Sequence, residues 1–478
     1  MGETNTTSKV MSGSNDTYSN ASDIIKVYYQ ANIQKKDSKN KLDWGYEIEQ
    51  NAISSFQLIE SFFNKLPLLT IDIYDTGEWT NTFLFQPGEC LRLRVVPRLG
   101  NEDEVVKPYI DSFFNIETVS YVCIQDSGKY IYRLNCIYHA ESYLNKVCEW
   151  PHKLGKIQEK IVGYDENSEV VVKNIVGEGG LKFKYMLTSD PSDKMFWLNK
   201  TMKCCDFVNK IIDHSWIGMN DAPVTYVDRD GTFYYDSLNR LCGQTEKIKY
   251  MYQTLYRKRQ AAQNKVGKII YDRPYTDLSI YNIPINAFRK GLVVNSIQYN
   301  PYNKKELNTD NMKPQKVEDE EVISFRKSEF SATGSKLSNV SNKSSHSIKN
   351  LCEKEYSGIY FKELHEYYNV APLHHANMKD AFFTRFVLMT LNITDQHDVD
   401  YNQTGIPHLG DKVYIDASDV KYANRIQSGN HIISGMVHAW AANNAYTICL
   451  QCVNDGAYDP GQLTQTMQFE REQQNKKK

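Results

Sequence analysis

Apolar and polar residues alternate with a period of two in much of the chain, which predicts strands. The clearest case is Cys90–Val96, where three apolar residues alternate with two arginines. This is the spacing of a strand with one buried face. The same reading in the first half predicts strands at Leu68–Asp75, Thr82–Phe85, Thr118–Ile124 and Tyr130–Ile137. The last two flank an Asp-Ser-Gly turn at 126–128, and closely spaced hairpins of this kind favour a small barrel or sandwich.

The pattern changes in the middle of the chain. Cys205–His214 places four apolar residues on one face of a helix. Two short strands follow, Val224–Val227 and Thr232–Tyr235, separated by the turn Asp228–Gly231. We therefore expect a small α+β helix-and-hairpin module at about 195–262.

The second half returns to strands. Strands are predicted at Gly291–Tyr299, Arg385–Ile393, Lys412–Asp416, His431–Trp440 and Tyr446–Val453, with a short helix near Asn377–Phe383. The fold class is therefore β-rich α+β.

Three segments contain too few apolar residues to offset the entropy of ordering them. They are an N-terminal arm at 1–22, an internal insertion at 303–350 with an acidic run at Glu318–Glu321, and the charged end, residues 468–478, of a C-terminal tail at 456–478. We predict that all three are disordered.

Composition narrows the class of protein. The 478 residues carry a net charge of −2, which does not favour a dedicated nucleic-acid binder. No apolar run approaches the roughly 20 residues of a membrane-spanning helix, and no signal peptide is visible, so the ten cysteines are expected to be reduced thiols. The 33 tyrosines favour half-buried strands and subunit contacts.

Five landmarks occur in an order that resembles the baseplate central hub proteins of contractile-tailed bacteriophages, which are related to the hub part of type VI secretion spike proteins. One landmark is a Gly-Asp-x-Val strand and another is a strand with the pattern Ser-Gly-x-x-Ile-Ile followed by a His. The matching stretches are Phe207–Leu238, Gly291–Tyr299, Pro372–Phe383, Gly410–Ile415 and Ser428–His438.

The resemblance implies two domains shaped like tail-tube subunits, at 23–194 and 263–455, on either side of the module at 195–262. It implies a homotrimer whose six barrels form a pseudo-six-fold ring between the six-fold tail tube and the three-fold central spike. The implied partners are the spike protein, the tail tube or its initiator, the surrounding baseplate wedge proteins and the tape measure C-terminus. DNA would only pass through the lumen, no membrane is involved, and the protein would reside in the virion after assembly in the host cytoplasm.

Several polar groups could instead be reactive sites. Cys449 and Cys452 form a Cys-x-x-Cys motif, but an odd spacing in a strand sends the thiols to opposite faces. The adjacent pair Cys204-Cys205 has a poor geometry for chelation. His438 is expected to be a partly buried imidazole on the same strand face as Ile432, Ser434, Met436 and Trp440.

Other candidates also have simpler structural readings. Asp228, Asp230 and Gly231 resemble the start of a calcium loop, but position twelve is Asn239 where a Glu is needed. Gly177–Gly180 lacks the Lys-Ser/Thr of a phosphate loop and reads as a hairpin tip between strands at 170–176 and 181–187. Polar loops or solvated faces are expected for His374-His375, for Asp395, His397, Asp398 and Asp400, and for Tyr256–Arg259.

No catalytic motif is found, and no catalytic, cofactor-binding or metal-binding residue is expected. The sequence thus favours a non-enzymatic structural protein without a cofactor. The alternatives are a virion-associated cell-wall hydrolase that uses residues such as His438 and Asp411, or the hub of a phage-derived injection system.

Overall fold

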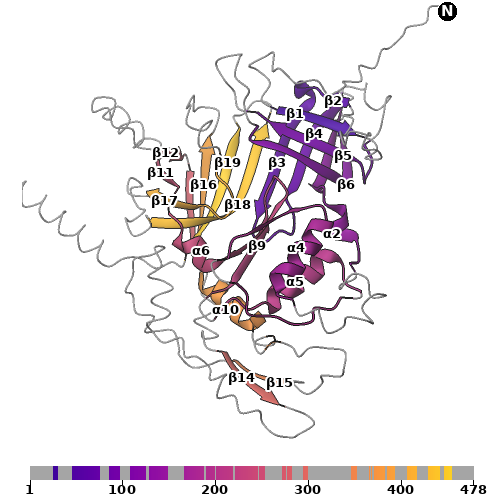
Figure 1. Ribbon diagram of the computed structural model, residues 1–478. Coiled ribbons are helices and arrows are strands. Elements are labelled where there is room, and N and C mark those ends of the chain that lie inside the picture. The colour runs from indigo at the N-terminus through magenta and orange to yellow at the C-terminus, as the bar shows by residue number, and fades with distance from the viewer. Residues whose placement is uncertain are drawn as a thin grey trace, which may run out of the picture.

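The computed structural model describes the two β-rich halves and the module between them (Figure 1). The described residues are 25–30, 46–75, 85–96, 108–124, 129–148, 166–187, 190–199, 201–218, 221–245, 247–252, 272–275, 277–282, 294–299, 346–351, 365, 368, 371–382, 385–392, 406–416, 429–441 and 446–454. The expected disordered arm at 1–22 and the tail at 456–478 lie outside these residues.

Seven strands come from the first half of the chain. They are β1 (Ile25–Gln30), β2 (Tyr46–Ile48), β3 (Ile53–Ser61), β4 (Leu68–Asp75), β5 (Cys90–Val95), β6 (Ile110–Ile124) and β7 (Lys129–Tyr138). They pair antiparallel in the order β3-β4-β7-β6-β5-β1-β2. Only the 3-10 turn η1 (Gln50–Ala52) and Glu49 separate β2 from β3, so the pairing returns along the chain to its start.

The strands after the module pair in a similar circuit. They are β11 (Ile248–Tyr252), β12 (Asp272–Tyr275), β13 (Asp277–Asn282), β16 (Arg385–Asn392), β17 (Lys412–Asp416), β18 (Gly429–Ala441) and β19 (Thr447–Asn454). Their order is β13-β16-β19-β18-β17-β11-β12. Thr276 alone separates β12 from β13.

The two halves are joined edge to edge into one large sheet (Figure 1). Along this seam, Ser55–Ser61 of β3 pairs antiparallel with Gly435–Ala441 of β18. The inward-facing residues of both halves belong to one apolar core, in which Phe56 of β3 contacts Trp440 of β18 with 6.4 Å between ring centroids. The seam is therefore a continuation of the core and not a contact between two separate surfaces.

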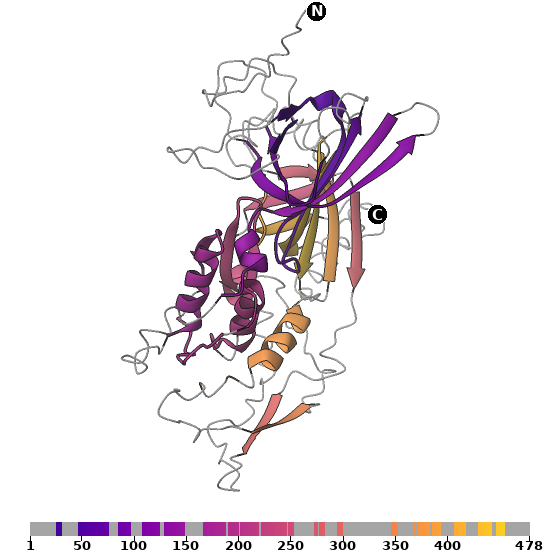
Figure 2. The ribbon, with the colours of Figure 1, turned by 90° about the vertical axis from the view of Figure 1, so that its right-hand side faces the viewer.

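The module lies against one end of the large sheet (Figures 1 and 2). Its three-stranded sheet has the order β8 (Lys182–Tyr185), β10 (Thr232–Ser237), β9 (Pro223–Val227). Its helices are α2 (Glu141–Asn145), α4 (Ser168–Glu178), α5 (Cys204–His214) and α6 (Leu238–Gly243). The apolar faces of α4 and α5 enclose a second core.

Strand pairing crosses both boundaries expected for the module. Strand β8 lies before residue 195 but pairs with β10 of the module. Strand β11 lies before residue 263 but pairs with β17 in the large sheet. Each of these strands belongs to the sheet with which it forms hydrogen bonds. The local sequence pattern does not indicate which sheet that is.

A second small sheet and a helix complete the described structure. Strands β14 (Val294–Tyr299) and β15 (His346–Leu351) pair parallel, apart from the large sheet. The expected strand at Gly291–Tyr299 is therefore present as β14, but it does not pair with the other strands of the second half. The last residues of the expected 303–350 insertion form β15. Helix α10 (Ala371–Phe382) begins six residues before the expected one.

Most of the expected strands and the helix α5 are confirmed, but one expected hairpin is wrong. Residues 170–176 belong to helix α4, not to a strand. Val171, Val172, Ile175 and Val176 are all fully buried, and this spacing places them on one helical face. Packing in the module core therefore outweighs the preference of valine for strands.

A substitution at Gly410 tests the conformation of the turn that leads into β17. The φ of Gly410 is +79°, and a Cβ at this position would overlap the Tyr226 hydroxyl. We expect Gly410→Ala to lower the free energy of unfolding by about 1–3 kcal/mol, because it adds backbone strain to a steric clash. Gly177→Ala is the control, since it lies in a helix with open space around it and should be neutral or stabilising by up to about 1 kcal/mol. Equal midpoints in urea for both variants would contradict the assignment.

Candidate functional site

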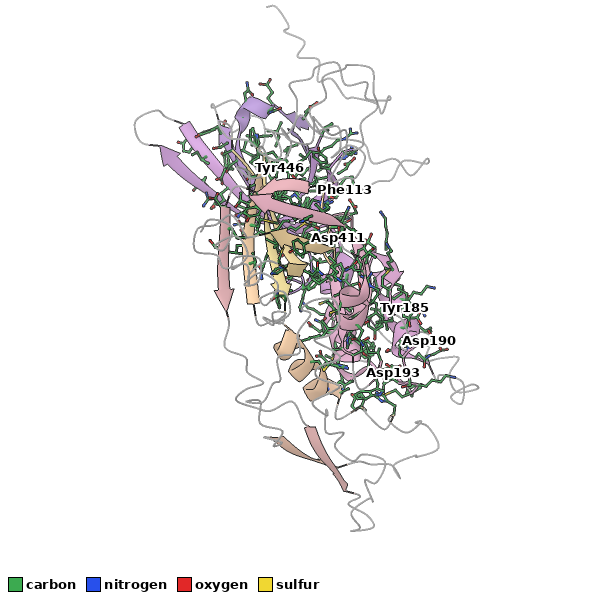
Figure 3. The ribbon with its side chains drawn as sticks, turned by 90° about the vertical axis from the view of Figure 1, so that its left-hand side faces the viewer. Phe113, Tyr185, Asp190, Asp193, Asp411 and Tyr446 are labelled. Atoms are coloured by element: carbon green, nitrogen blue, oxygen red, sulfur yellow. The ribbon has the colours of Figure 1, made fainter. Side chains whose placement is uncertain are left out.

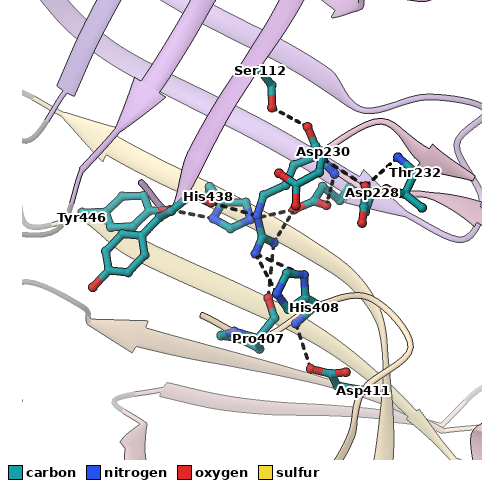
Figure 4. Close-up of polar contacts among 12 residues, drawn as sticks. Ser112, Asp228, Asp230, Thr232, Pro407, His408, Asp411, His438 and Tyr446 are labelled. Atoms are coloured by element: carbon teal, nitrogen blue, oxygen red, sulfur yellow. Dashed lines mark hydrogen bonds and ion pairs between the residues drawn. The ribbon is translucent and has the colours of Figure 1, made fainter. Parts of the chain in front are cut away.

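A charged cluster is buried where the two halves and the module meet, and we call it the junction cluster (Figure 4). It consists of Glu60 of β3, Arg229 of the β9–β10 turn, His438 of β18, Tyr446 just before β19 and His408 before β17. The first four are at most 2% exposed. Burying charges is costly unless they are paired, so these contacts constrain how the three parts fit together.

Glu60 and Arg229 form the central ion pair. One guanidinium nitrogen of Arg229 lies 3.2 Å from Glu60 Oε1, and the Arg229 backbone N–H donates to Glu60 Oε2 at 2.7 Å. The carboxylate of β3 thus binds both the side chain and the backbone of the turn. Glu60 therefore both neutralises the charge of Arg229 and holds the backbone of the turn in place.

The remaining donors of Arg229 reach other segments. Its Nε donates to the Tyr109 carbonyl at 3.1 Å, and Nη1 donates to the Pro407 carbonyl at 3.3 Å. Nη2 lies 3.3 Å from the ring of His408. The Arg229 carbonyl in turn accepts a hydrogen bond from the Ser112 hydroxyl. One arginine therefore contacts both halves of the large sheet.

The hydrogen bonds around His438 define its tautomer. Burial raises the pKa of Glu60, but Arg229 and His438 outweigh this effect and lower it to about 2, so the carboxylate is ionised and only accepts. His438 Nε2, 2.9 Å from Glu60, must therefore donate. Burial lowers the pKa of His438, and in the neutral ring Nδ1 accepts from the Tyr446 hydroxyl at 2.7 Å.

The electrostatics favour a fixed structure over proton transfer. Burial and the nearby Arg229 lower the pKa of His408 to about 4, so its ring is neutral near pH 7. Burial also raises the pKa of Tyr446 far above its usual value. Glu60, His408 and Tyr446 therefore each keep one protonation state at neutral pH, which suits a structural junction.

The turn that carries Arg229 is shaped by its own residues. Asp228 Oδ1 accepts from the backbone N–H groups of Asp230 and Thr232, at 3.0 and 2.9 Å. Gly231 has a φ of +70°, and a Cβ there would overlap the Tyr138 hydroxyl. The residues that resemble the start of a calcium loop thus form a hairpin turn, as expected, and the turn presents Arg229 to Glu60.

Asp411, a candidate of the alternative hydrolase reading, takes part in a neighbouring network. Its Oδ1 pairs with Lys247 Nζ at 2.5 Å, and its Oδ2 accepts from the His408 backbone N–H at 3.1 Å. Lys412 Nζ donates to the Cys242 carbonyl at 2.9 Å. These contacts connect α6 and β11 to the start of β17 (Asp411 is also labelled in Figure 3).

The expected face of His438 needs a correction. A β-bulge between Ile433 and Gly435 shifts the register of β18. Ile432 consequently lies on the opposite face from His438, whereas Met436 and Trp440 remain on its face. His438 is also fully buried, not partly buried as expected.

The remaining sequence candidates lie apart from the junction cluster. Cys452 is buried and Cys449 half-buried on opposite faces of β19, as expected. Among the described residues, no group of three or more His, Cys, Asp or Glu side chains could hold a metal ion. The polar loop expected for His374-His375 is wrong, because both residues lie in helix α10 and His375 is buried. Gly177–Gly180 is not a hairpin tip but the end of helix α4. Asp395, His397, Asp398, Asp400 and Tyr256–Arg259 lie outside the described residues.

The sequence contains one signal for the junction cluster, in the burial pattern of β3. In β3, Phe56, Leu58 and Glu60 follow one another at a spacing of two, and all three are buried. A carboxylate in line with core residues indicates a buried charge that needs a cation. The partner, Arg229, is 169 residues away, and no local pattern identifies it.

Fold and site define a β-rich protein whose two similarly paired halves are joined along the seam between β3 and β18, and whose module is tied to β3 by a buried ion pair. The chain is similar to solved tail proteins at low sequence identity. They are a tail protein from Neisseria meningitidis MC58 (9% identity, 91% of this chain and 97% of that chain, TM-score 0.46) and the 43 kDa tail protein of prophage MuSo2 from Shewanella oneidensis (6%, 90% and 96%, TM-score 0.44). A third is prophage tail protein gp18 from Listeria monocytogenes EGD-e (9%, 89% and 94%, TM-score 0.42).

No family model matches the sequence, and no curated protein matches it at a significant level. Among the described residues, no helix is long and apolar enough to cross a membrane.

The central ion pair can be tested by removing one charge. We expect Glu60→Gln to lower the free energy of unfolding by about 3–5 kcal/mol, because Arg229 would keep a buried charge without its counter-ion. Lys65→Gln is the matched control: it breaks the ion pair between Lys65 and Asp206, whose side chains are 48% and 44% exposed, and should cost less than about 1 kcal/mol. Chemical denaturation measures both. Similar losses for the two variants would contradict the role of the junction cluster.

Asp228 gives a prediction for the pH dependence of stability. Burial raises the pKa of Asp228 from 3.8 to about 6, so between these values the folded protein binds more protons than the unfolded chain. The contribution of this group to stability therefore increases as the pH falls from 6 to 4. Asp228→Asn keeps the Oδ1 acceptor but not the charge, and should be more stable than the parent at pH 7 by up to about 3 kcal/mol.

The measurement compares urea denaturation of Asp228→Asn and the parent from pH 4 to 8. Taking the difference between the two proteins removes the contribution of Glu60, which has the opposite sign and is lost as the pH falls below 4.5. The advantage of the variant should disappear by pH 4. A difference that does not change with pH would show that Asp228 ionises normally.

Proposed function

We propose that this chain is a structural subunit of the baseplate hub of a contractile tail. The sequence landmarks support this role, and one structural observation carries it. The strands of the two halves pair in the same order, β3-β4-β7-β6-β5-β1-β2 and β13-β16-β19-β18-β17-β11-β12. In each half, the last strand of this order is followed directly in the chain by the first, β2 by β3 and β12 by β13, with only a short break between them. This is the connectivity expected of a tube-like barrel.

Two such barrels in one chain reconcile different symmetries. Three chains would supply six similar units around an axis, enough to meet a six-fold tail tube on one face. The same three chains repeat only three times around the axis, as a central spike does. A rigid relation between the two barrels is essential for this adaptor, and the junction cluster and the seam supply it.

The module and the partners complete the proposal. The module lies at one end of the large sheet (Figure 2). In a ring of such chains, the module would therefore be present on one face and absent from the other. The partners are the central spike, the tail tube or its initiator, the wedge proteins and the tape measure C-terminus, and DNA would pass through the lumen. The protein acts in the virion without catalysis, and the hub of a phage-derived injection system would have the same design.

The oligomeric state tests the proposed function. We expect the purified full-length chain to form a species of three times its mass of 55.3 kDa as its concentration rises, measured by mass photometry and sedimentation. Imaging of tail particles should place three copies around the axis next to the spike. A chain that stays monomeric and binds neither tube nor spike proteins would exclude the hub role.

A further inference from the structure

The two halves correspond strand by strand. The shared pairing order makes β3 equivalent to β13, β4 to β16, β7 to β19, β6 to β18 and β5 to β17. The likeness extends to irregularities, since β6 and β18 each contain a β-bulge opposite the strand that follows them, at Ile116/Thr118 and Ile433/Gly435. Bulges at the same place in the pairing pattern support the equivalence of the two strands.

The equivalent strands β18 and β6 differ in what covers their outer edges. Before its bulge, β18 pairs with the short strand β17, and beyond the bulge its edge is covered by β3 along the seam. Before its own bulge, β6 pairs with β5 as far as Asn115. Beyond the bulge, from Thr118 to Ile124, no described strand pairs with this edge of β6. Among the described residues, the first half thus has a position equivalent to the seam that no strand fills.

The part of β6 that no described strand covers, Thr118 to Ile124, has features of an edge that pairs with a strand of another molecule. It projects with β7 beyond the rest of the sheet (Figure 2). Tyr121 lies opposite Tyr132, which is buried, so Tyr121 is on the core face of the sheet, yet it is 70% exposed. From Thr118 to Ile124 the sequence contains no Lys, Arg or Pro, the residues that commonly protect an exposed edge from pairing.

We propose that the edge of β6 from Val119 to Ile124 pairs antiparallel with β13 of a second copy of this chain. Strand β13 is the equivalent of β3, which fills the corresponding place at the seam, and β16 is the one described strand that pairs with it. The inference rests on the proposed function. Around a ring of barrels, the seam within each copy would alternate with a seam between neighbouring copies, and together they would close the ring. The β13 of the same copy is not available, since β3, β4 and β7 separate β6 from the second half.

The register follows from the correspondence. Thr118 of β6 pairs with Asn135 as Gly435 of β18 pairs with Gln451, so Tyr121 is equivalent to His438. Counting through the next two strand pairs makes Ile280 equivalent to Leu58. Because His438 lies opposite Leu58 at the seam, Tyr121 should lie opposite Ile280 of the second copy.

The charges agree with this direction. Glu117 precedes the edge in β6, and Asp277 is the first residue of β13. In the antiparallel arrangement these two carboxylates lie at opposite ends of the pair, whereas a parallel arrangement would bring the like charges together.

Disulfide trapping tests the register directly. In a Cys123→Ser background, a copy with Val122→Cys is mixed with a copy with Ser279→Cys, since these positions should lie opposite each other. Cα atoms opposite each other in a sheet are about 4.5–5.5 Å apart, close enough for a disulfide. Mild oxidation should give a covalent dimer that reductant reverses. Val122→Cys mixed with Tyr281→Cys, displaced by two residues, is the matched control and should give much less.

Charge variants test the consequence for assembly. Tyr121→Lys or Ser279→Lys should weaken self-association at least about tenfold by sedimentation, because a lysine at either place blocks edge pairing. Phe63→Lys, a substitution at another exposed aromatic residue, should have no effect. Tyr121→Phe should assemble like the parent.

The outcomes separate this inference from the proposed function. A trimer that persists in both lysine variants, with no dimer trapped above the control, overturns the pairing of β6 with β13 and leaves the hub role standing. A parent chain that is monomeric at every concentration, with no trapped dimer, overturns both. A dimer trapped in the predicted register, together with weakened assembly of both lysine variants, supports both.

Discussion

The buried ion pair between Glu60 and Arg229 is the contact on which the arrangement of the three parts depends. Neither charge could remain in the core alone, so β3 and the β9–β10 turn must meet whenever the chain folds. His438 then orients on the same carboxylate, which fixes β18 against β3. Apolar packing supplies the stability of the seam, while the polar cluster selects one register among those that apolar residues would tolerate.

The sequence was informative wherever one face of a strand or helix is buried. Strand β4 and helix α5 agree with their expected limits within one residue because their apolar residues follow a single period. Helix α4 was missed because its consecutive valines favour strands locally, and the module core decides otherwise. Of the junction cluster, the sequence indicates His438 and the turn that contains Arg229. Glu60 stayed hidden because β3 was not predicted, and its partner is set by the tertiary fold.

The similarity of the two halves is a similarity of pairing and not of residues. Tyr121 and His438 stand at equivalent places in the two halves, as do Thr70 and Leu388, and the members of each pair differ in chemistry. The halves share their strand order and the position of a bulge. They also share two consecutive strands, β2 and β3 or β12 and β13, that lie at opposite ends of the pairing order. Such features depend on backbone geometry, and many side chains satisfy them.

The geometry of the seam also determines how it bears mechanical load. Seven consecutive residue pairs connect β3 to β18, and their hydrogen bonds run across the strands. A force along the strands loads all of these bonds together, in shear, whereas a force that peels one end breaks them one after another. The seam is therefore strongest along the direction of its strands. In the proposed hub role, the protein would gain most from aligning that direction with the pull of contraction.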